Sequence, residues 1–171
     1  MEMEIKIRTI SNKDIDSLSQ LVLGFKNEHS RMIGGKKAVK LKDALRETKQ
    51  HIQRQNTGYF VAVNTKNQLI GFRRWEFLDG FYFTRELYII PKARKQGVAK
   101  LLIRHFEKWL LQKNQSVACV SCTPHNLTMM MLARSEGYQI LNTIEMRKDL
   151  ITRPRKPRGK AQALGLYWKV L

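Results

Sequence analysis

The sequence predicts a single α/β domain, residues 1–171, in which helices pack on a mixed β-sheet. Two patterns carry this prediction. Stretches in which polar and apolar residues alternate are typical of half-buried strands, whereas apolar residues at every third or fourth position are typical of amphipathic helices. The two kinds of stretch interleave along the chain, and 171 residues are enough to bury most of the apolar surface in one core.

The N-terminal half is expected to hold four strands and two helices. Alternating residues 4–10 predict the first strand, and Ser11 offers a cap for a helix whose apolar spacing ends at Phe25, so that the helix stops near Asn27. Gly34 and Gly35 mark the loop that follows. The remaining elements are a helix at 39–53, a hairpin of strands at 59–63 and 69–77, and a strand at 81–90 that is ended by Pro91.

The C-terminal half is expected to contain a helix at 98–113, a strand at 117–120, a helix from Thr123 to Gly137, and strands at 138–150 and 163–171. A basic segment at about 151–161 separates the last two strands and could be taken for a disordered tail. The apolar, aromatic run after it favours a final strand that pairs back across a basic loop. The predicted order is therefore β-α-α-β-β-β-α-β-α-β-β in one mixed sheet.

Charge and composition restrict the function classes. The 32 basic residues against 14 acidic ones give a net charge of +18, which indicates an anionic partner or substrate, although a basic surface without such a role is also possible. No apolar run approaches the roughly 20 residues of a membrane span. The N-terminal residues lack the pattern of a secretory signal, so a cytoplasmic protein is expected.

Two cysteines, Cys119 and Cys122, have the spacing of a redox pair or of half a zinc site. A second half-site is missing. Residues three apart on a strand point to opposite faces, so a structural role is favoured and no metal site is expected.

The strand before Pro91 leads through a basic turn into a helix that starts at Gly97, and this geometry suits a diphosphate. The first N–H groups of a helix have no partner within the helix, and the helix dipole places positive charge there. Gly97 lets an oxygen approach the backbone without meeting a Cβ atom. Arg94, Lys95 and Lys100 add charge around the same point.

This segment resembles the cofactor-binding motif of the GNAT acyltransferase superfamily, in which a strand of the pattern Leu-Tyr-Val-x-Pro runs into Arg/Gln-x-x-Gly-x-Gly/Ala and a helix. Arg94, Gly97 and Ala99 stand at the three diagnostic positions. The intervening positions hold Lys95, Gln96 and Val98. In element order the resemblance covers the whole chain, and its sequence motifs lie at residues 86–110 and 117–138.

The resemblance implies an N-acetyltransferase with the GNAT fold and acetyl-CoA as donor, bound at a V-shaped splay between strands 4 and 5. Leu87, Tyr88 and Ile89 would offer main-chain groups to the pantetheine arm, and the Ile89 N–H would polarise the thioester carbonyl. Asn126 matches a family asparagine near the pantetheine or phosphate. It could equally be a polar residue at a helix start.

Transfer to a primary amine by direct attack also requires a group that accepts a proton. Glu86 is the candidate base, because many family members carry a carboxylate on this strand; alternatively, it faces solvent or pairs with Arg85 or Arg73. The chain departs from the family at Ala133, where a general-acid tyrosine is usual. Water could protonate the leaving thiolate instead, and the spacing favours no other tyrosine.

The acceptor is expected to be anionic or carried on an anionic molecule. In this fold two loops flank the acceptor side, and here residues 26–54 hold nine Lys/Arg against three Asp/Glu, while residues 151–171 hold six and none. Two basic loops beside the acceptor would repel polyamines. The alternative is a nucleic-acid-associated GNAT protein that acetylates aminoacyl-tRNA or only binds RNA. The acyl length and the oligomeric state stay open, and a homodimer is one option.

Overall fold

The computed structural model describes residues 4–35, 38–146, 159–163 and 166–170, the last two segments as backbone only. The chain divides into two compact units, Met1–Ser121 and Cys122–Leu171. Each unit is described by itself below. That residues 1–171 make up one domain stays a prediction.

The helices and strands follow one another in the order predicted from the sequence. They are β1 (Lys6–Thr9), α1 (Ile15–Met32), α2 (Leu41–Gln53), β2 (Thr57–Val63), β3 (Leu69–Leu78), β4 (Phe81–Ile89), α3 (Val98–Gln112), β5 (Ala118–Val120), α4 (Leu127–Ser135), β6 (Gly159–Ala163) and β7 (Leu166–Val170). Short 3₁₀ turns at Asn12–Asp14 and Pro91–Ala93 precede α1 and α3.

The first unit is built on a five-stranded sheet in the order β1-β2-β3-β4-β5. Its first four strands are antiparallel neighbours, and β5 runs parallel to β4, which makes the sheet mixed. Pairing of β4 with β5 reaches only from Tyr82 to Thr84, where the Ser121 N–H donates to the Thr84 carbonyl at 3.1 Å. The rest of β4 continues without β5, so the predicted splay between strands 4 and 5 is confirmed.

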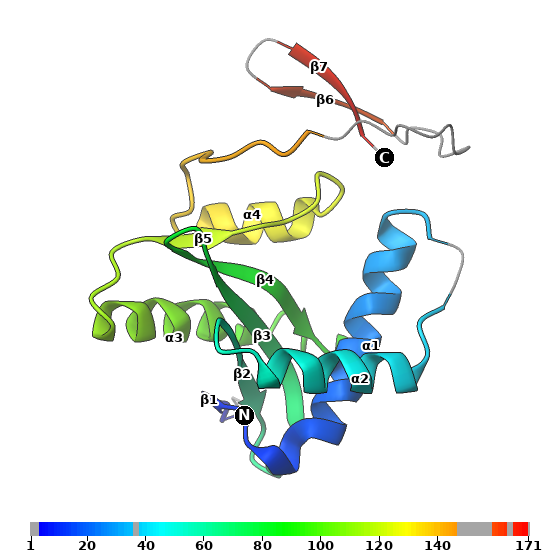
Figure 1. Ribbon diagram of the computed structural model, residues 1–171, viewed down its shortest axis with the longest axis vertical. Helices are drawn as coiled ribbons and strands as arrows, with labels where there is room; N and C mark the ends of the chain where they lie inside the picture. The colour runs from blue at the N-terminus through cyan, green and yellow to red at the C-terminus, as the bar shows by residue number, and fades with distance from the viewer. Residues whose placement is uncertain (1–3, 36–37, 147–158, 164–165, 171) are drawn as a thin grey trace. The chain divides into compact units, whose positions relative to one another are not determined.

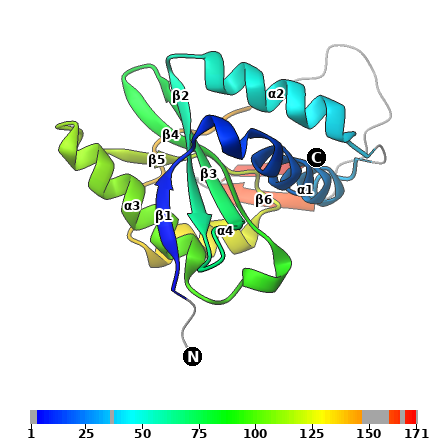
Figure 2. The same cartoon turned by 90° about the horizontal axis from the view of Figure 1, so that it is seen from below.

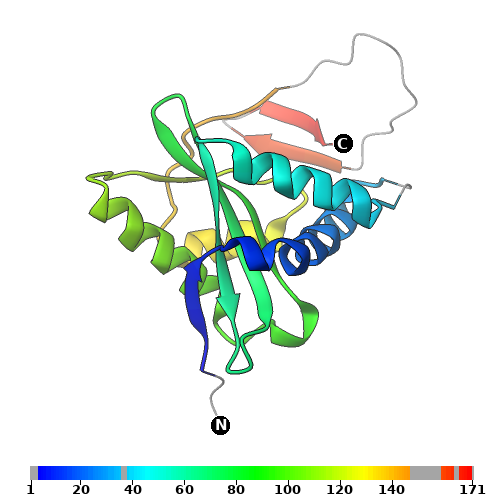
Figure 3. The ribbon, with the colours of Figure 1, turned by 60° about the horizontal axis from the view of Figure 1, so that its bottom comes forward.

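Helices cover both faces of this sheet, as Figures 1 and 2 show. Helices α1 and α2 lie side by side on one face, which Figure 3 shows from a third direction. On that face Leu18 and Val22 of α1 pack on Tyr59, Val61 and Phe72 of the strands. Helix α3 covers the other face through a second apolar cluster: Phe60, Ala62, Ile70, Ile89, Val98, Leu102, Phe106 and Leu110.

A β-bulge interrupts the β3–β4 hairpin. From the turn outward, Leu78 pairs with Phe81 and Trp75 with Thr84, but the next pair is Arg74 with Glu86, so that Arg85 is the extra residue. A bulge changes the face to which the following side chains point. As a result Glu86 and Tyr88 lie on the α1–α2 face of the sheet.

Helix α1 is longer than predicted, because it runs to Met32 rather than to Asn27. Its apolar stripe does end at Phe25, but the next turn has other partners. The His29 ring stacks on Phe25 with 5.7 Å between the ring centroids, and Glu28 pairs with Arg94. The apolar spacing therefore marked the end of the buried stripe and not the end of the helix.

Helix α4 ends at Ser135, and Gly137 follows it with a left-handed backbone of φ +95°. Beyond this point the second unit differs from the prediction. Residues 138–146 form no strand, and residues 147–150 lie outside the described part. Strand β7 pairs with β6, whose residues overlap the expected basic loop, and together they make a two-stranded sheet of their own. Among the described residues, the expectations of a single sheet and of a strand over 138–146 were wrong.

Candidate active site

The open edge of β4 begins where its pairing with β5 ends. The Ile90 N–H donates to the Ile70 carbonyl at 3.0 Å, which makes these two residues a hydrogen-bonded pair of the antiparallel ladder. Since such pairs alternate, Gly71 opposite Ile89 and Arg73 opposite Leu87 are non-bonded pairs. The main-chain N–H and C=O groups of Leu87 and Ile89 therefore point away from β3, toward the open edge.

Tyr88 lies between these two residues and has the opposite orientation. It pairs with Phe72 in the ladder, and its carbonyl is so close to β3 that a Cβ atom on Gly71 would lie 2.8 Å from it. The prediction that Tyr88 offers main-chain groups at the open edge is therefore wrong. The reason is that alternate residues of a strand direct their main-chain groups to opposite sides.

The turn after β4 holds two residues in the left-handed conformation, Lys95 with φ +60° and Gly97 with φ +79°. Turns of this kind direct backbone N–H groups into a concavity that suits anions. Gly97 is the N-cap of α3, and its carbonyl accepts the first helical bond from Leu101 at 3.1 Å. The N–H groups of Val98 and Ala99 thus have no partner within the helix.

Space for a ligand exists in front of this turn. A Cβ atom built on Gly97 would meet nothing within 4 Å. Val98 is buried under the turn, whereas Lys95, Gln96 and Lys100 are exposed. The Gln96 side chain is bound within the turn, because its Nε2 donates to the Lys92 carbonyl at 3.0 Å.

The side chain of Arg94 turns away from the concavity. Its Nη2 lies 2.7 and 2.8 Å from the two carboxylate oxygens of Glu28 on α1, and its Nε donates to the Ile89 carbonyl at 2.9 Å. The guanidinium also lies over the Tyr88 ring, 5.6 Å from the centroid. This first motif residue therefore contacts the end of β4 and α1.

Glu86 is the candidate base, and it is almost fully buried, with 7% of its surface exposed. Its Oε1 lies 3.3 Å from Nε of Arg74, the residue opposite on β3. Its Oε2 has no hydrogen-bond partner among the described residues. Burial raises the pKa of Glu86, and the charge of Arg74 opposes that effect.

The predicted alternatives for Glu86 are not observed. Glu86 neither faces solvent nor pairs with Arg85 or Arg73. Arg85, the extra residue of the bulge, lies beside Glu76, with 3.1 Å between Nε and the carboxylate. Arg73 lies on the α3 face of β3, where its guanidinium contacts the Thr84 hydroxyl and lies over the Phe106 ring.

A second polar group adjoins Glu86 on the α1–α2 face. His51 Nδ1 lies 2.9 Å from the Tyr59 hydroxyl, and Glu47 pairs with Lys26 at 2.6 Å. Burial lowers the pKa of His51 to about 4, and burial together with the charge of Glu86 raises the pKa of Tyr59. Near neutral pH the imidazole and the phenol are therefore both uncharged.

The two predicted positions on α4 belong to the second unit. Asn126 is the N-cap of α4, and its side-chain oxygen accepts the Met129 N–H at 3.0 Å. This is the capping role that the sequence left open. Ala133 is buried, and its carbonyl accepts the Tyr138 N–H at 3.1 Å in the helix end that Gly137 allows.

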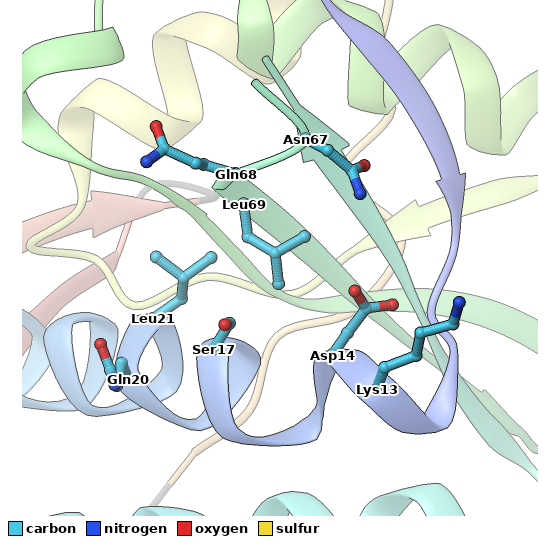
Figure 4. A pocket seen from close by; sticks show the side chains of 8 residues that line it. All are labelled: Lys13, Asp14, Ser17, Gln20, Leu21, Asn67, Gln68 and Leu69. Atoms are coloured by element: carbon cyan, nitrogen blue, oxygen red, sulfur yellow. The ribbon is translucent and has the colours of Figure 1, made fainter. Parts of the chain in front are cut away.

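A polar groove of about 470 Å³ lies elsewhere, between the start of α1 and the β2–β3 turn (Figure 4). Its one carboxylate, Asp14, is bound by Arg8 at 2.6 and 2.9 Å, and this pairing holds the pKa of Asp14 well below its usual range. A second groove of about 470 Å³ is lined by Trp75, Tyr82 and Trp109. Neither Glu86 nor the turn at Gly97 lines either of these two grooves.

The described residues include neither a membrane-spanning helix nor a cluster of metal-binding side chains. None of their helices is long and apolar enough to cross a membrane. Within the same part of the chain, no three or more His, Cys, Asp or Glu residues gather as they would around a metal ion, and both cysteines are free thiols whose pKa is raised by burial.

An open strand edge thus leads into a turn at a helix start whose backbone suits an anion, and sequence comparison identifies the family to which this arrangement belongs. Residues 27–138 match the profile of the Acetyltransferase (GNAT) family. The chain belongs to this family, and it is an acyltransferase. No curated protein has a significantly similar sequence.

Solved structures show the same fold. A probable acetyltransferase superposes with a TM-score of 0.71 at 15% identity, covering 86% of this chain and 99% of that one. AAC(6')-Iy in complex with the bisubstrate analogue CoA-S-monomethyl-acetylneamine gives 0.65 at 16% identity, covering 86% and 99%. The aminoglycoside 6'-N-acetyltransferase AAC(6')-Ih from Acinetobacter baumannii gives 0.65 at 16%, covering 87% and 100%.

Sequence reasoning missed two residues of this site, Glu28 and Arg74. Glu28 lies three residues after the last apolar position of α1, where no pattern points to the sheet. Arg74 would have been found by counting pairs from the Asp79–Gly80 turn only if the bulge at Arg85 had been recognised. Both residues act on a predicted site residue from another element.

Proposed function

We propose that this chain transfers an acetyl group from acetyl-CoA to a primary amine by direct attack. One observation carries the proposal: the open edge of β4, with the main-chain groups of Leu87 and Ile89, leads directly into the left-handed turn at Gly97 and the start of α3. Acetyl-CoA, when bound, would supply the acetyl thioester, and CoA would leave as the thiol. The similar AAC(6')-Iy was solved with CoA and with a CoA-linked bisubstrate analogue, which supports this choice of donor.

The donor half of the reaction would rest on backbone groups. The diphosphate fits the concavity in front of Gly97, where an added Cβ atom has no protein neighbour and where the N–H groups of Val98 and Ala99 are available. Lys95, Gln96 and Lys100 surround this point. The pantetheine amides can pair with Leu87 as an added strand would, and the Ile89 N–H can donate to the thioester carbonyl.

The acceptor half would use Glu86. An amine attacks as the neutral base, so its proton must leave during the reaction, and a buried carboxylate with a raised pKa is suited to receive it. Because Glu86 Oε2 is buried, we propose that one water carries the proton from the amine to this oxygen. With Ala133 at the usual tyrosine position, solvent would protonate the departing thiolate.

The acceptor would be anionic or carried on an anionic molecule. The carboxylates nearest to Glu86 give no net negative site, since Glu47 pairs with Lys26 and Glu76 lies beside Arg85. The excess of cations over residues 26–54 is thus left for a ligand. The aminoglycosides named for the similar enzymes carry positive charge, so they serve as acceptors of opposite charge in a comparison.

A thiol-release screen with acetyl-CoA tests this function. Acceptors of one size would be compared in pairs that differ in charge, for example acidic and basic peptides, nucleotide-linked amines, aminoacyl-tRNA and an aminoglycoside. We expect CoA to raise the melting temperature and thiol to appear only with an acceptor, most rapidly with the anionic ones. Faster turnover of the aminoglycoside would overturn the acceptor class. RNA binding with a steep salt dependence and no thiol release would favour a binding protein instead.

A further inference from the structure

Arg94 stands at the first position of the cofactor motif, where its charge was expected to face the diphosphate. Its guanidinium instead contacts both carboxylate oxygens of Glu28, at 2.7 and 2.8 Å, and the carbonyl of Ile89, at 2.9 Å. A guanidinium offers its donors in a planar fork, and this fork is directed at α1 and β4. The side chain is thus engaged away from the turn.

The Ile89 carbonyl is one of the main-chain groups that point to the open edge of β4. Arg94 occupies one of the two acceptor sites of this oxygen, so an extended ligand that pairs with this edge would share it with the guanidinium. The groups that the ligand would have to itself are the N–H and C=O of Leu87 and the N–H of Ile89. Through this bond Arg94 fixes the peptide group between Ile89 and Ile90, which comes directly after the Ile89 N–H at the end of the open edge.

Helix α1 approaches β4 closely at the same level. A Cβ atom on Gly24 would lie 2.6 Å from the Tyr88 hydroxyl, so the Tyr88 side chain reaches from the strand to the helix backbone at Gly24. One turn further along α1, Glu28 reaches Arg94. The helix that leads to the acceptor-side loop and the strand that would hold the donor are therefore joined at one point.

We propose that Arg94 is a positioning residue: with Glu28 it ties α1 to the end of β4 and fixes the backbone at Ile89, so that the Ile89 N–H is aimed at the thioester carbonyl. This inference rests on the proposed function, because it concerns the donor of that reaction. Binding of the diphosphate is then left to the backbone of the turn and to lysines, and Arg94 contributes little to CoA affinity.

Infrared spectroscopy of bound acetyl-CoA, labelled with ¹³C at the carbonyl, measures the aim of the Ile89 N–H without an acceptor. Calorimetry with CoA measures affinity. The variants are Arg94→Gln and Glu28→Gln, and Lys92→Gln is the matched control because it removes a charge from the same turn but contacts neither Glu28 nor Ile89. The side chains of Arg94 and Glu28 are 43% and 36% exposed, so both variants are expected to fold, and circular dichroism checks this.

We expect the wild type and Lys92→Gln to lower the carbonyl frequency on binding, and both test variants to lose most of that shift. Their CoA dissociation constants should stay within about twofold of the wild type, a difference too small for a lost phosphate contact. An unchanged shift in both variants would reduce the pair to a structural contact.

The competing assignment predicts the opposite for affinity. If Arg94 binds the diphosphate, Arg94→Gln weakens CoA about tenfold or more, whereas Glu28→Gln strengthens it by releasing the guanidinium. That pattern would overturn the inference and leave the proposed function intact. A wild type that binds no CoA would overturn the proposed function, and the inference with it.

Discussion

Replacing Gly97 by alanine, with Gly80→Ala as the matched control, tests the donor site most directly. Both glycines have a left-handed backbone, φ +79° at Gly97 and φ +85° at Gly80, and a Cβ atom on either meets nothing within 4 Å. The two substitutions therefore introduce the same backbone strain without a clash. Only Gly97 lies at the start of α3, since Gly80 belongs to the β3–β4 turn.

The magnitudes follow from these two properties. A left-handed conformation costs a residue with a Cβ atom about 1–2 kcal/mol, so both variants should be destabilised by that amount. Their melting temperatures should fall by roughly 2–4 °C for each kcal/mol. Gly97→Ala also places a methyl group where the diphosphate would approach. Loss of one charge-assisted hydrogen bond, about 1.5–3 kcal/mol, would weaken CoA binding by roughly ten- to a hundredfold.

Calorimetry with CoA and thermal unfolding, run on both variants, separate the two effects. Gly80→Ala should share the loss of stability and retain the CoA affinity of the wild type. Equal CoA affinities for Gly97→Ala and Gly80→Ala would refute the assignment of the turn as the diphosphate site.

Three further predictions concern the acceptor half and the stability of the units. Glu86→Gln should lower kcat by about a hundredfold or more and remove the acidic limb of the pH–rate profile. Arg74→Met should move that limb to higher pH, because the charge of Arg74 opposes the rise in the pKa of Glu86. An unchanged pH–rate profile in both variants would exclude Glu86 as base. The pKa of His51 is lowered from 6.5 to about 4, so the buried neutral imidazole stabilises the fold above pH 6.5, and this contribution of up to about 3 kcal/mol is lost as the pH falls toward 4. In urea unfolding, the free energy of unfolding of His51→Gln should therefore change less with pH over that range than that of the wild type. The same pH dependence in both proteins would contradict the burial of a neutral imidazole. Asn126→Ala should cost about 1 kcal/mol of stability through the lost cap, and a clear loss of CoA affinity as well would show that this residue contacts the donor.

The sequence predicted those parts of the molecule that depend on local backbone chemistry. Pro91 ends β4 because its ring fixes φ and removes the N–H donor, and Gly97 starts α3 with a positive φ because it has no Cβ atom. The order of the elements followed in the same way from apolar periodicity. The end of α1 was missed because Glu28 and His29, which stabilise its last turns, are polar residues outside the apolar periodicity: Glu28 pairs with Arg94 and His29 stacks on Phe25.

Predictions failed where the result depends on pairing between distant segments. The final apolar run does form a strand, β7, but its partner is β6 in the basic segment and not a strand at 138–150. Composition made the basic segment resemble a loop, although charged residues also occur in antiparallel strands. Strand propensity indicates that a segment is extended and leaves its partner undetermined.

The bulge at Arg85 has the largest consequence for function. Counted without it, the β3–β4 hairpin would place Glu86 opposite Arg73, on the α3 face; with it, Glu86 lies opposite Arg74, on the α1–α2 face. The charge that adjusts the pKa of Glu86 and the face on which Glu86 lies therefore both depend on one extra residue. The donor site is built from backbone and could be predicted locally, whereas the acceptor site is built from side chains that a single bulge reassigns. For this reason the variants of Glu86 and Arg74 test the register of β4 as well as the chemistry: if Arg74→Met left the acidic limb in place while Arg73→Met moved it, the hairpin would have to pair without the bulge.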